Sequence, residues 1–251
     1  MTLLTREARA LWAAAMFFTR VRMPSLPPPT AEEQRRATAY WPLIGALVGA
    51  AIAGIWALAA TRFPPGVAVG LALAAGLLLT GALHEDGFAD VCDGFGGGAT
   101  PARVLEIMRD SSVGAFGAIG IVMLLGLKWQ VMTALPPALL PAAVIAAHTL
   151  SRGAAVMIMV ALPYARTDAS RARAMVGHPG GRLFGVAAIA LAPLPLLPLA
   201  GQLAALALVA GVWGICFRWL RRRLGGYTGD CLGAVQQLAE VAFLLAVLAA
   251  G

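Results

Sequence analysis

The chain has 251 residues, of which 60 % are hydrophobic and 12 % charged, and its mean hydropathy is +0.80. This composition excludes a soluble globular domain and, with long apolar runs, indicates a polytopic membrane protein. The net charge of +7 does not indicate nucleic-acid binding, because the basic residues lie in short segments between the apolar runs, as in membrane proteins. The three cysteines form no CxxC pair, so neither a disulfide framework nor a zinc site is predicted.

The N-terminal segment 1–41 is predicted to lie along the membrane surface, ahead of a transmembrane bundle formed by residues 42–251. Together they make one integral-membrane domain. The first apolar stretch is short and is followed by Arg20 and Arg22, so we expect no cleaved signal peptide. Within residues 4–18 the apolar side chains share one helical face and the arginines point away, which predicts an interfacial helix.

Two short helices are predicted from their capping residues. Thr30 and Glu33 form a capping box directly after the proline-rich run 24–29. Further on, Thr100 stands as the N-cap and Pro101 as the first residue of a second short helix.

Seven apolar segments follow, which predicts an all-α transmembrane helix bundle of about seven spans. If the N-terminus is cytoplasmic, nearly all the arginines outside the spans fall on the cytoplasmic side, and only Arg62, with Lys128 as a borderline case, falls on the other. This asymmetry is typical of membrane proteins and places the chain's N-terminus inside the cell. The predicted spans are residues 42–60, 67–83, 113–135, 138–162, 183–199, 203–217 and 232–250.

Four carboxylates stand within nine residues directly after the second predicted span: Glu85, Asp86, Asp90 and Asp93. The three aspartates are spaced i, i+4 and i+7, so on a helix they point the same way. Like charges on one face repel each other, and a cation is expected to offset that repulsion. Mg²⁺ is the economical candidate, since it prefers carboxylate oxygens and bound phosphates. The alternative is a solvated acidic loop between membrane helices.

The segment ahead of the third predicted span joins a charged pair, Arg109 and Asp110, to a small turn that contains Ser111 and Gly114. Such a turn can offer backbone N–H groups to a phosphate. It can equally be a plain junction between two helices.

A second small turn, residues 225–230, precedes the last predicted span. Gly226 and Gly229, on either side of Thr228, would allow a nucleotide to approach the backbone closely. Asp230 follows them and is predicted to lie on the same cytoplasmic side of the membrane as Glu85, Asp86, Asp90 and Asp93. It could complete a metal cluster or accept a proton as a general base.

Ionisable residues inside a predicted span indicate function by default. His148 and Arg152 stand at i and i+4 in the fourth span. Arg152 could bind substrate, or it could pair with Glu240 of the last span as part of the structure, and His148 could be a satisfied core histidine. The arginine run 218–223 could bind phosphate or only contact anionic lipid headgroups.

Taken in order, these motifs resemble those of the cobalamin synthases, the adenosylcobinamide-GDP ribazoletransferases. The resemblance covers nearly the whole chain. It rests on the stretch from His84 to Gly94, on the helix 103–110 that runs into Ser111 and Gly114, and on Gly226 to Ala234 with Glu240 beyond. Phe18-Thr19-Arg20 and Ser151-Arg152 match it too. Glu85 departs from the family pattern, standing where an apolar residue is expected, and is either an extra ligand or only a neighbour.

The resemblance implies an integral, Mg²⁺-dependent enzyme of the bacterial inner membrane with a cytoplasmic active face. It would join adenosylcobinamide-GDP to α-ribazole or its 5′-phosphate and release GMP, the ribose 3′-hydroxyl attacking the phosphate on the cobinamide side. A homo-oligomer is compatible with the sequence. The catalytic residues expected are His84, Asp86, Asp90, Asp93 and Asp230. The metal ligands expected are Glu85, Asp86, Asp90, Asp93 and Asp230. The substrate-binding residues expected are Arg109, Asp110, Ser111, Gly114, Arg152, Gly226, Thr228 and Gly229.

Two alternatives remain from the sequence. One is another Mg²⁺-dependent membrane transferase acting on a diphosphate, either a CDP-alcohol phosphotransferase or a UbiA-type prenyltransferase. This sequence lacks the Asp-Gly-x-x-Ala-Arg continuation expected of a CDP-alcohol phosphotransferase. It also lacks the second aspartate-rich helix expected of a UbiA-type prenyltransferase. The other alternative is a cation-coupled transporter, which would need paired broken helices and access from both faces.

Overall fold

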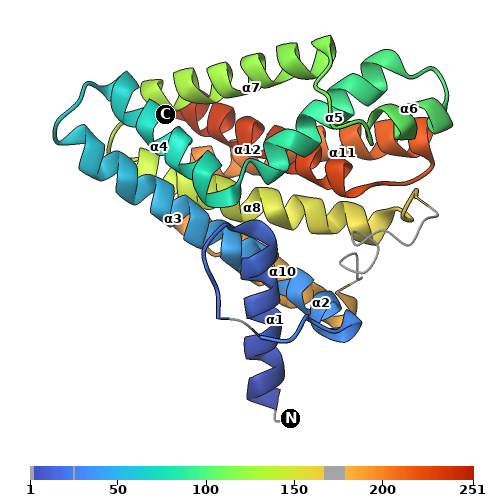
Figure 1. The fold of residues 1–251 in the computed structure, drawn as a ribbon. Coiled ribbons are helices and arrows are strands. Elements are labelled where there is room, and N and C mark those ends of the chain that lie inside the picture. Colours follow the sequence, from blue (N-terminus) through green and yellow to red (C-terminus); the bar gives the residue numbers. More distant parts are fainter. Residues whose placement is uncertain (1–2, 25, 167–178) are drawn as a thin grey trace.

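The computed structural model describes residues 3–24, 26–166 and 179–251, and within these ranges the protein is an all-helical bundle (Figure 1), as the sequence predicts. Part of the basic loop 163–182, including Arg171 and Arg173, lies outside the described residues. The longer helices are α1 (Leu3–Phe18), α3 (Trp41–Ala60), α4 (Pro65–Thr80), α5 (Leu83–Gly97), α7 (Ala115–Ala134), α8 (Leu140–Ala161), α11 (Leu199–Leu224) and α12 (Gly229–Ala250). The shorter ones are α2 (Ala31–Ala37), η1 (Thr38–Tyr40), α6 (Pro101–Ile107), η2 (Gly180–Arg182), α10 (Leu183–Leu191) and η3 (Leu194–Leu196).

Several helices are long and apolar enough to cross a membrane. Five pass by length and composition alone, and the bent pair of α4 and α5 makes a sixth if it counts as one span. The segment predicted as the fifth span is a shorter apolar helix over Gly180–Leu196, interrupted near its prolines. The chain is therefore a multi-pass membrane protein, with five or six candidate spans where the sequence predicts about seven.

The bundle has an inside and an outside. In their most apolar stretches, α12 is 83 % buried and α8 is 72 % buried, whereas α7 is 28 % and α11 only 22 % buried. The exposed apolar side chains of α7 and α11 are those a lipid bilayer would cover. Polar residues on α8 and α12 are consequently held inside the protein.

Close packing of α3 on α8 depends on Gly45 and Gly49, which stand four residues apart. A Cβ at Gly45 would collide with the carbonyl oxygen of His148, and one at Gly49 would lie 2.8 Å from the Cα of Ile145. Small residues at this spacing let two membrane helices approach each other without a side chain between them. The contact brings His148 and its neighbours against α3.

A sharp bend of 88° separates α4 from α5. Gly81 and Ala82 form it, with φ angles of +66° and +55°. The left-handed region suits glycine but costs alanine about 1–2 kcal/mol. On the N-terminal side of the bend, the backbone N–H of Arg20 donates to the carbonyl of Leu79 at 2.7 Å. The bend therefore directs the acidic helix α5 across the bundle and not along the line of α4.

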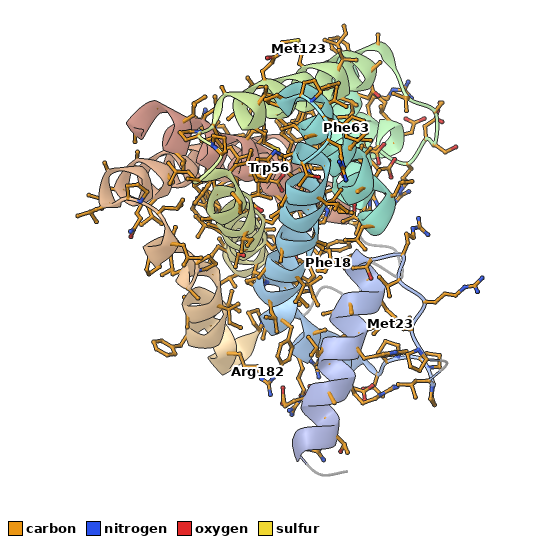
Figure 2. The ribbon with its side chains drawn as sticks, turned by 90° about the vertical axis from the view of Figure 1, so that its left-hand side faces the viewer. Phe18, Met23, Trp56, Phe63, Met123 and Arg182 are labelled. Atoms are coloured by element: carbon orange, nitrogen blue, oxygen red, sulfur yellow. The ribbon has the colours of Figure 1, made fainter. Side chains whose placement is uncertain are left out.

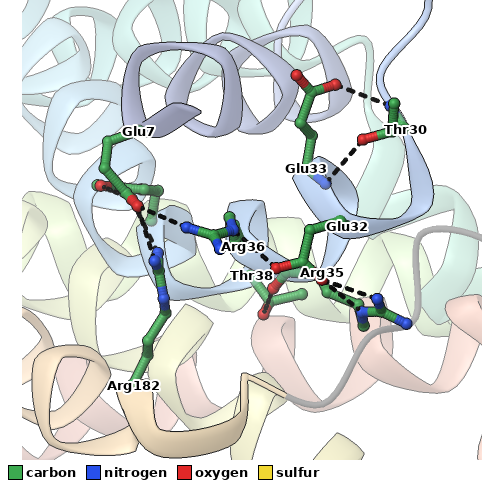
Figure 3. A network of polar contacts seen from close by, with 9 residues as sticks. Glu7, Thr30, Glu32, Glu33, Arg35, Arg36, Thr38 and Arg182 are labelled. Carbon is green, nitrogen blue, oxygen red and sulfur yellow. Dashed lines mark hydrogen bonds and ion pairs between the residues drawn. The ribbon is translucent and has the colours of Figure 1, made fainter. Parts of the chain in front are cut away.

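The N-terminal helix α1 projects from the bundle on the side away from α7 (Figure 1). Glu7 holds it there: its carboxylate accepts hydrogen bonds from Tyr40, Arg36 and Arg182 at 2.7–3.1 Å (Figure 3). These bonds, that of Arg182 first, lower the pKa of Glu7 to about 2. The same end of α1 carries Arg9, whose side chain pairs with Glu33 at 3.0 Å.

Both predicted capping patterns are confirmed. Thr30 and Glu33 form the complete capping box of α2, and the Thr100 side chain accepts the N–H of Arg103 at the start of α6, with Pro101 as its first residue. Phe18, at the other end of α1, lies where this helix reaches the bundle (Figure 2).

Candidate active site

The acidic helix α5 packs directly against the first turn of α12. At Gly87 a Cβ would lie 2.9 Å from both the Cα and the carbonyl oxygen of Asp230, so only glycine allows this approach. Asp86 and Asp90 flank Gly87 on α5, the first exposed and the second partly buried. The negative charges of Asp230 and Asp86 both act on Asp90. The fold thus brings together carboxylates that stand about 140 residues apart in the sequence.

Asp230 has a basic partner that the sequence did not indicate. Its Oδ2 accepts a hydrogen bond from Arg166 Nη2 at 2.8 Å and another from the Thr228 hydroxyl at 3.2 Å. Thr228 is also the N-cap of α12, where its side chain accepts the N–H of Cys231. Arg166 offsets part of the repulsion that Asp90 experiences. The predicted phosphate turn is therefore tied to the carboxylates through Thr228.

Asp93 is turned away from that group and toward α7. Its two carboxylate oxygens accept the backbone N–H groups of Gly114 and Gly117, each at 2.8 Å. These N–H groups have no partner within α7, and a carboxylate at a helix N-terminus also interacts favourably with the helix dipole. Asp93 thus holds the start of α7 against α5, and Gly114 presents its N–H to this carboxylate.

Glu85 also points away from Asp86, Asp90 and Asp230, and it belongs to a buried polar network inside the bundle. Its Oε1 accepts a hydrogen bond from Gln237 at 2.9 Å and lies 3.9 Å from Lys128 Nζ. Lys128 forms an ion pair with Glu240 at 2.6 Å, and Glu240 lies 3.2 Å from His148 Nδ1. The interpretation of Glu85 as only a neighbour of the metal ligands agrees with these contacts better than a role as a ligand.

Lys128 is the chain's only lysine, and the sequence predicts it near the non-cytoplasmic membrane surface as a borderline case. In the structure it is buried within α7, with 3 % of its surface exposed. Its charge is neutralised by Glu240, which explains how it is tolerated there. Arg152 reaches the same network through His148, since its Nη1 donates to the His148 carbonyl at 2.9 Å.

A cavity of about 180 Å³ lies beside the carboxylates. Its lining includes five of the residues expected to act: His84, Asp86, Arg152, Gly229 and Asp230. They come from α5, α8 and α12. The structure therefore gathers residues from three of the predicted motifs around one space.

Other expected residues lie outside that space. Arg109, Asp110 and Ser111 are exposed in the connection between α6 and α7. Asp110 accepts both the N–H and the hydroxyl of Ser112, at 2.9 and 2.5 Å, which lowers the pKa of Asp110. The room that Gly226 leaves is taken by the backbone of Pro163, whose carbonyl accepts the N–H of Tyr227 at 3.0 Å.

The donor set at the α5–α12 contact is suited to Mg²⁺. In residues 3–24, 26–166 and 179–251, no three His, Cys, Asp or Glu side chains already form a group that could hold a metal ion. Mg²⁺ commonly takes one or two protein carboxylates and completes its shell with water and substrate phosphates. Asp86, Asp90 and Asp230 supply only oxygen ligands, and their mutual repulsion leaves negative charge for a cation to neutralise.

Several residues of the site could not have been selected from the sequence. Arg166 stands in a loop among other arginines, and Gln236 and Gln237 are neutral residues in an apolar helix. Arg223 was interpreted only as part of a basic run, but its Nη2 donates to the carbonyls of Phe95 and Gly98 at the end of α5, at 3.2 and 2.6 Å. The one available signal was the pair Gln236 and Gln237, which with Glu240 interrupts the apolar sequence of the last span.

Comparisons with known proteins agree with these motifs. A family model described as cobalamin-5-phosphate synthase matches residues 10–248. The chain is 46 % identical to a protein of Ralstonia nicotianae named adenosylcobinamide-GDP ribazoletransferase, over 99 % of this chain and 98 % of that one. Proteins of the same name from Leptothrix cholodnii and Shewanella oneidensis are 44 % and 38 % identical, over at least 98 % of this chain and 96 % of theirs. No solved structure matches the chain.

Proposed function

This chain belongs to the cobalamin-5-phosphate synthase family and is an adenosylcobinamide-GDP ribazoletransferase, and we propose that its reaction takes place where α5 meets α12. The activity joins adenosylcobinamide-GDP to α-ribazole and is the nucleotide-loop assembly step of cobalamin synthesis. One observation carries the location: Asp86 and Asp230, with Arg152 and His84, line a single cavity next to Asp90.

The residues of this cavity have chemically distinct roles in the proposal. Arg152 places a permanent positive charge beside the cavity, where it would attract a phosphate of the diphosphate substrate. Asp230 is oriented by Arg166 and Thr228, and we expect its carboxylate to serve as a metal ligand, with a role as general base as the alternative. His84 is buried and stacked on Phe18, with ring centroids 5.3 Å apart, so it shapes the wall of the cavity.

Mg²⁺ completes the proposal, held by Asp86, Asp90 and Asp230. When bound, it would neutralise the charge of the diphosphate and of the departing GMP. The support is the oxygen-only donor set and the unbalanced charge around Asp90. Asp93 contributes by fixing α7 to α5, and Glu85 by joining α5 to the buried network.

The membrane arrangement is also part of the proposal. We expect the N-terminus to be cytoplasmic, α1 to lie at the interface, and the α5–α12 contact to face the cytoplasm, in the inner membrane of a bacterium. The arginine asymmetry supports this orientation. The 88° bend supports a position of α5 at the membrane surface, since α5 would run along that surface if α4 crosses the bilayer.

A direct assay tests the location and the metal together. Purified protein is incubated with adenosylcobinamide-GDP, α-ribazole and Mg²⁺, and the release of GMP and formation of cobalamin are measured. In Asp90→Asn we expect kcat to fall by about 100-fold or more, because a ligand charge is lost. Glu106→Gln serves as control, since Glu106 is exposed and pairs only with Arg103 on its own helix. Near-normal turnover of Asp90→Asn at saturating Mg²⁺ would contradict the metal assignment.

Asp230→Asn separates the two roles open to that residue. A lost metal ligand raises the Mg²⁺ concentration needed for half-maximal activity, because the amide oxygen still binds but carries no charge. A lost general base lowers kcat, leaves the Mg²⁺ requirement unchanged and flattens the acidic limb of the pH–rate profile. We expect the metal pattern. An unchanged kcat, Mg²⁺ titration and pH profile would exclude both roles.

A further inference from the structure

The cavity beside the carboxylates has an aromatic wall supplied by the N-terminal part of the chain. Phe17 and Phe18 from the end of α1 line it, together with Trp41 from the start of α3. Phe17 stacks on Trp41 with ring centroids 5.8 Å apart, and Phe18 meets Trp41 edge to face at 5.0 Å. Leu83, Ala155 and Leu232 extend the apolar lining. One side of the cavity is therefore apolar and largely aromatic.

Beside this aromatic wall lies a buried hydrogen-bond donor without a partner among the described residues. Arg152 is 1 % exposed and lines the cavity, with its guanidinium carbon 5.5 Å from the centre of the Phe18 ring. Its Nη1 donates to His148, but its Nε has no hydrogen-bond partner among the residues that the structure describes. A buried N–H left in this state is costly, so a ligand that supplies an acceptor atom would be favoured.

The aromatic wall and the unpartnered N–H together define the chemistry of the ligand. An aromatic wall selects a flat ring system, and an arginine N–H selects one with an acceptor atom on its edge. An apolar cavity of about 150 Å³ can hold a benzene ring, so about 180 Å³ suits one or two fused rings. Guanine fits less well, because the aromatic wall offers no partner to its several donors and acceptors, and those that face this wall would lose their hydrogen bonds to water.

We propose that this cavity binds the base of the nucleoside acceptor, a flat and largely apolar heterocycle, with a ring nitrogen accepting the Nε–H of Arg152. The inference rests on the proposed function, because a base held here would place its ribose beside Asp86 and Asp230 at the cavity lining. The hydroxyl that attacks the diphosphate then lies next to these two carboxylates. Helix α1 thereby forms part of the substrate site.

Equilibrium binding tests the subsite without any turnover. Free benzimidazole is the probe and indole the comparison, since indole has the same shape but no ring nitrogen with a free lone pair. Using calorimetry on the full chain in detergent, we expect benzimidazole to bind at least about tenfold more tightly than indole. Benzimidazole should compete with α-ribazole. No binding of benzimidazole, or equal binding of both probes, would overturn the proposal.

Phe17→Leu keeps apolar bulk but removes one ring from the wall. We expect the KM for α-ribazole to rise about tenfold, the KM for adenosylcobinamide-GDP to stay within about twofold, and kcat to change little. The control is Phe184→Leu, an aromatic residue 85 % exposed on α10 and not part of the cavity. A rise only in the KM for adenosylcobinamide-GDP would assign the cavity to guanine and overturn the proposal, as would two unchanged KM values.

The two proposals fail separately. Benzimidazole binding needs no metal and no carboxylate chemistry, so it is measured equally well on Asp90→Asn. Active Asp90→Asn protein that still binds benzimidazole contradicts the metal assignment alone. Inactive Asp90→Asn protein that binds neither probe contradicts the base subsite alone. If Phe17→Leu unfolds, the comparison of benzimidazole with indole on the wild-type chain still decides.

Discussion

Asp90 and Asp93 stand three residues apart on α5, but their surroundings differ and we expect them to have different roles. Asp90 is surrounded by like charge, whereas both oxygens of Asp93 accept backbone N–H groups at the start of α7. We expect Asp93→Asn to lower stability by about 2 kcal/mol, because an amide can offer only one oxygen to the two N–H groups. The Mg²⁺ concentration for half-maximal activity should stay unchanged.

The matched measurement is thermal unfolding and Mg²⁺ titration of Asp93→Asn beside Asp90→Asn. Asp90→Asn should keep or raise the melting temperature, since it removes one of several repelling charges, while its Mg²⁺ requirement increases. If both variants shift the Mg²⁺ titration equally and neither loses stability, then Asp93 is a metal ligand and not an anchor of α7.

The Lys128–Glu240 ion pair, 2.6 Å long and nearly fully buried, gives a second test at this scale. Lys128→Met should destabilise the bundle by about 3–5 kcal/mol, because it removes the ammonium group that pairs with Glu240 and leaves the buried carboxylate in contact, among the described residues, only with His148 and Gln236. Adding Glu240→Gln should restore much of that loss. The double variant is the control, and a Lys128→Met protein as stable as the wild type would show that the pair contributes nothing. Unfolding in detergent monitors each protein.

At the scale of the elements, the site depends on how closely α5 and α12 approach each other. Gly87→Ala places a methyl group 2.9 Å from the backbone of Asp230, so the helices must separate and the carboxylates with them. We expect a lower melting temperature and at least about tenfold lower kcat. Gly126→Ala on α7 is the control: nothing lies within 4 Å of the added Cβ, and alanine in a helix gains up to about 1 kcal/mol. Equal melting temperatures for the two variants would refute the close contact.

Helix α5 also shows what could be predicted from the sequence and what could not. The spacing of Asp86, Asp90 and Asp93 predicts one helical face, and the structure confirms the helix. The spacing does not reveal which partner each carboxylate has, because partners come from elements that fold beside α5 from far along the chain. Asp93 meets α7, Glu85 meets α12, and Asp230 meets Arg166 in a loop.

At the scale of the whole molecule, the all-α class and most helix positions follow from apolar run length and capping residues. The number of spans was less predictable, because the bend at Gly81 and Ala82 and the breaks within residues 183–199 depend on backbone angles and not on hydropathy. The aromatic wall of the cavity was not predicted either. Within residues 1–41 only Phe18-Thr19-Arg20 matched the family pattern, and the position of Phe17 beside α12 could not be predicted from it.

Orientation in the membrane is the prediction that belongs to this scale. In a chain whose three native cysteines are replaced, we expect a single cysteine at Ala99 to be shielded from an impermeant thiol reagent in intact cells. Cysteines at Pro65 and Leu199, both exposed, should react, the second because we expect the shorter apolar segment Gly180–Leu196 to cross the membrane as well. The positive-inside asymmetry is the physical reason. Labelling of Ala99 from outside would reverse the topology. Ala169, in the basic loop, is a further predicted cytoplasmic position that lies outside the described residues.

The cavity that Phe17 shares with Gly229 and Asp230 joins the first long helix of the chain to the last one. The partners that hold α1 through Glu7 are all translated before α12, so one wall of the cavity can be in position before the other has been made. A chain that stops early can acquire α5 and all its aspartates and yet possess no pocket. The cavity therefore closes only when α12 has taken its place beside α1 and α5.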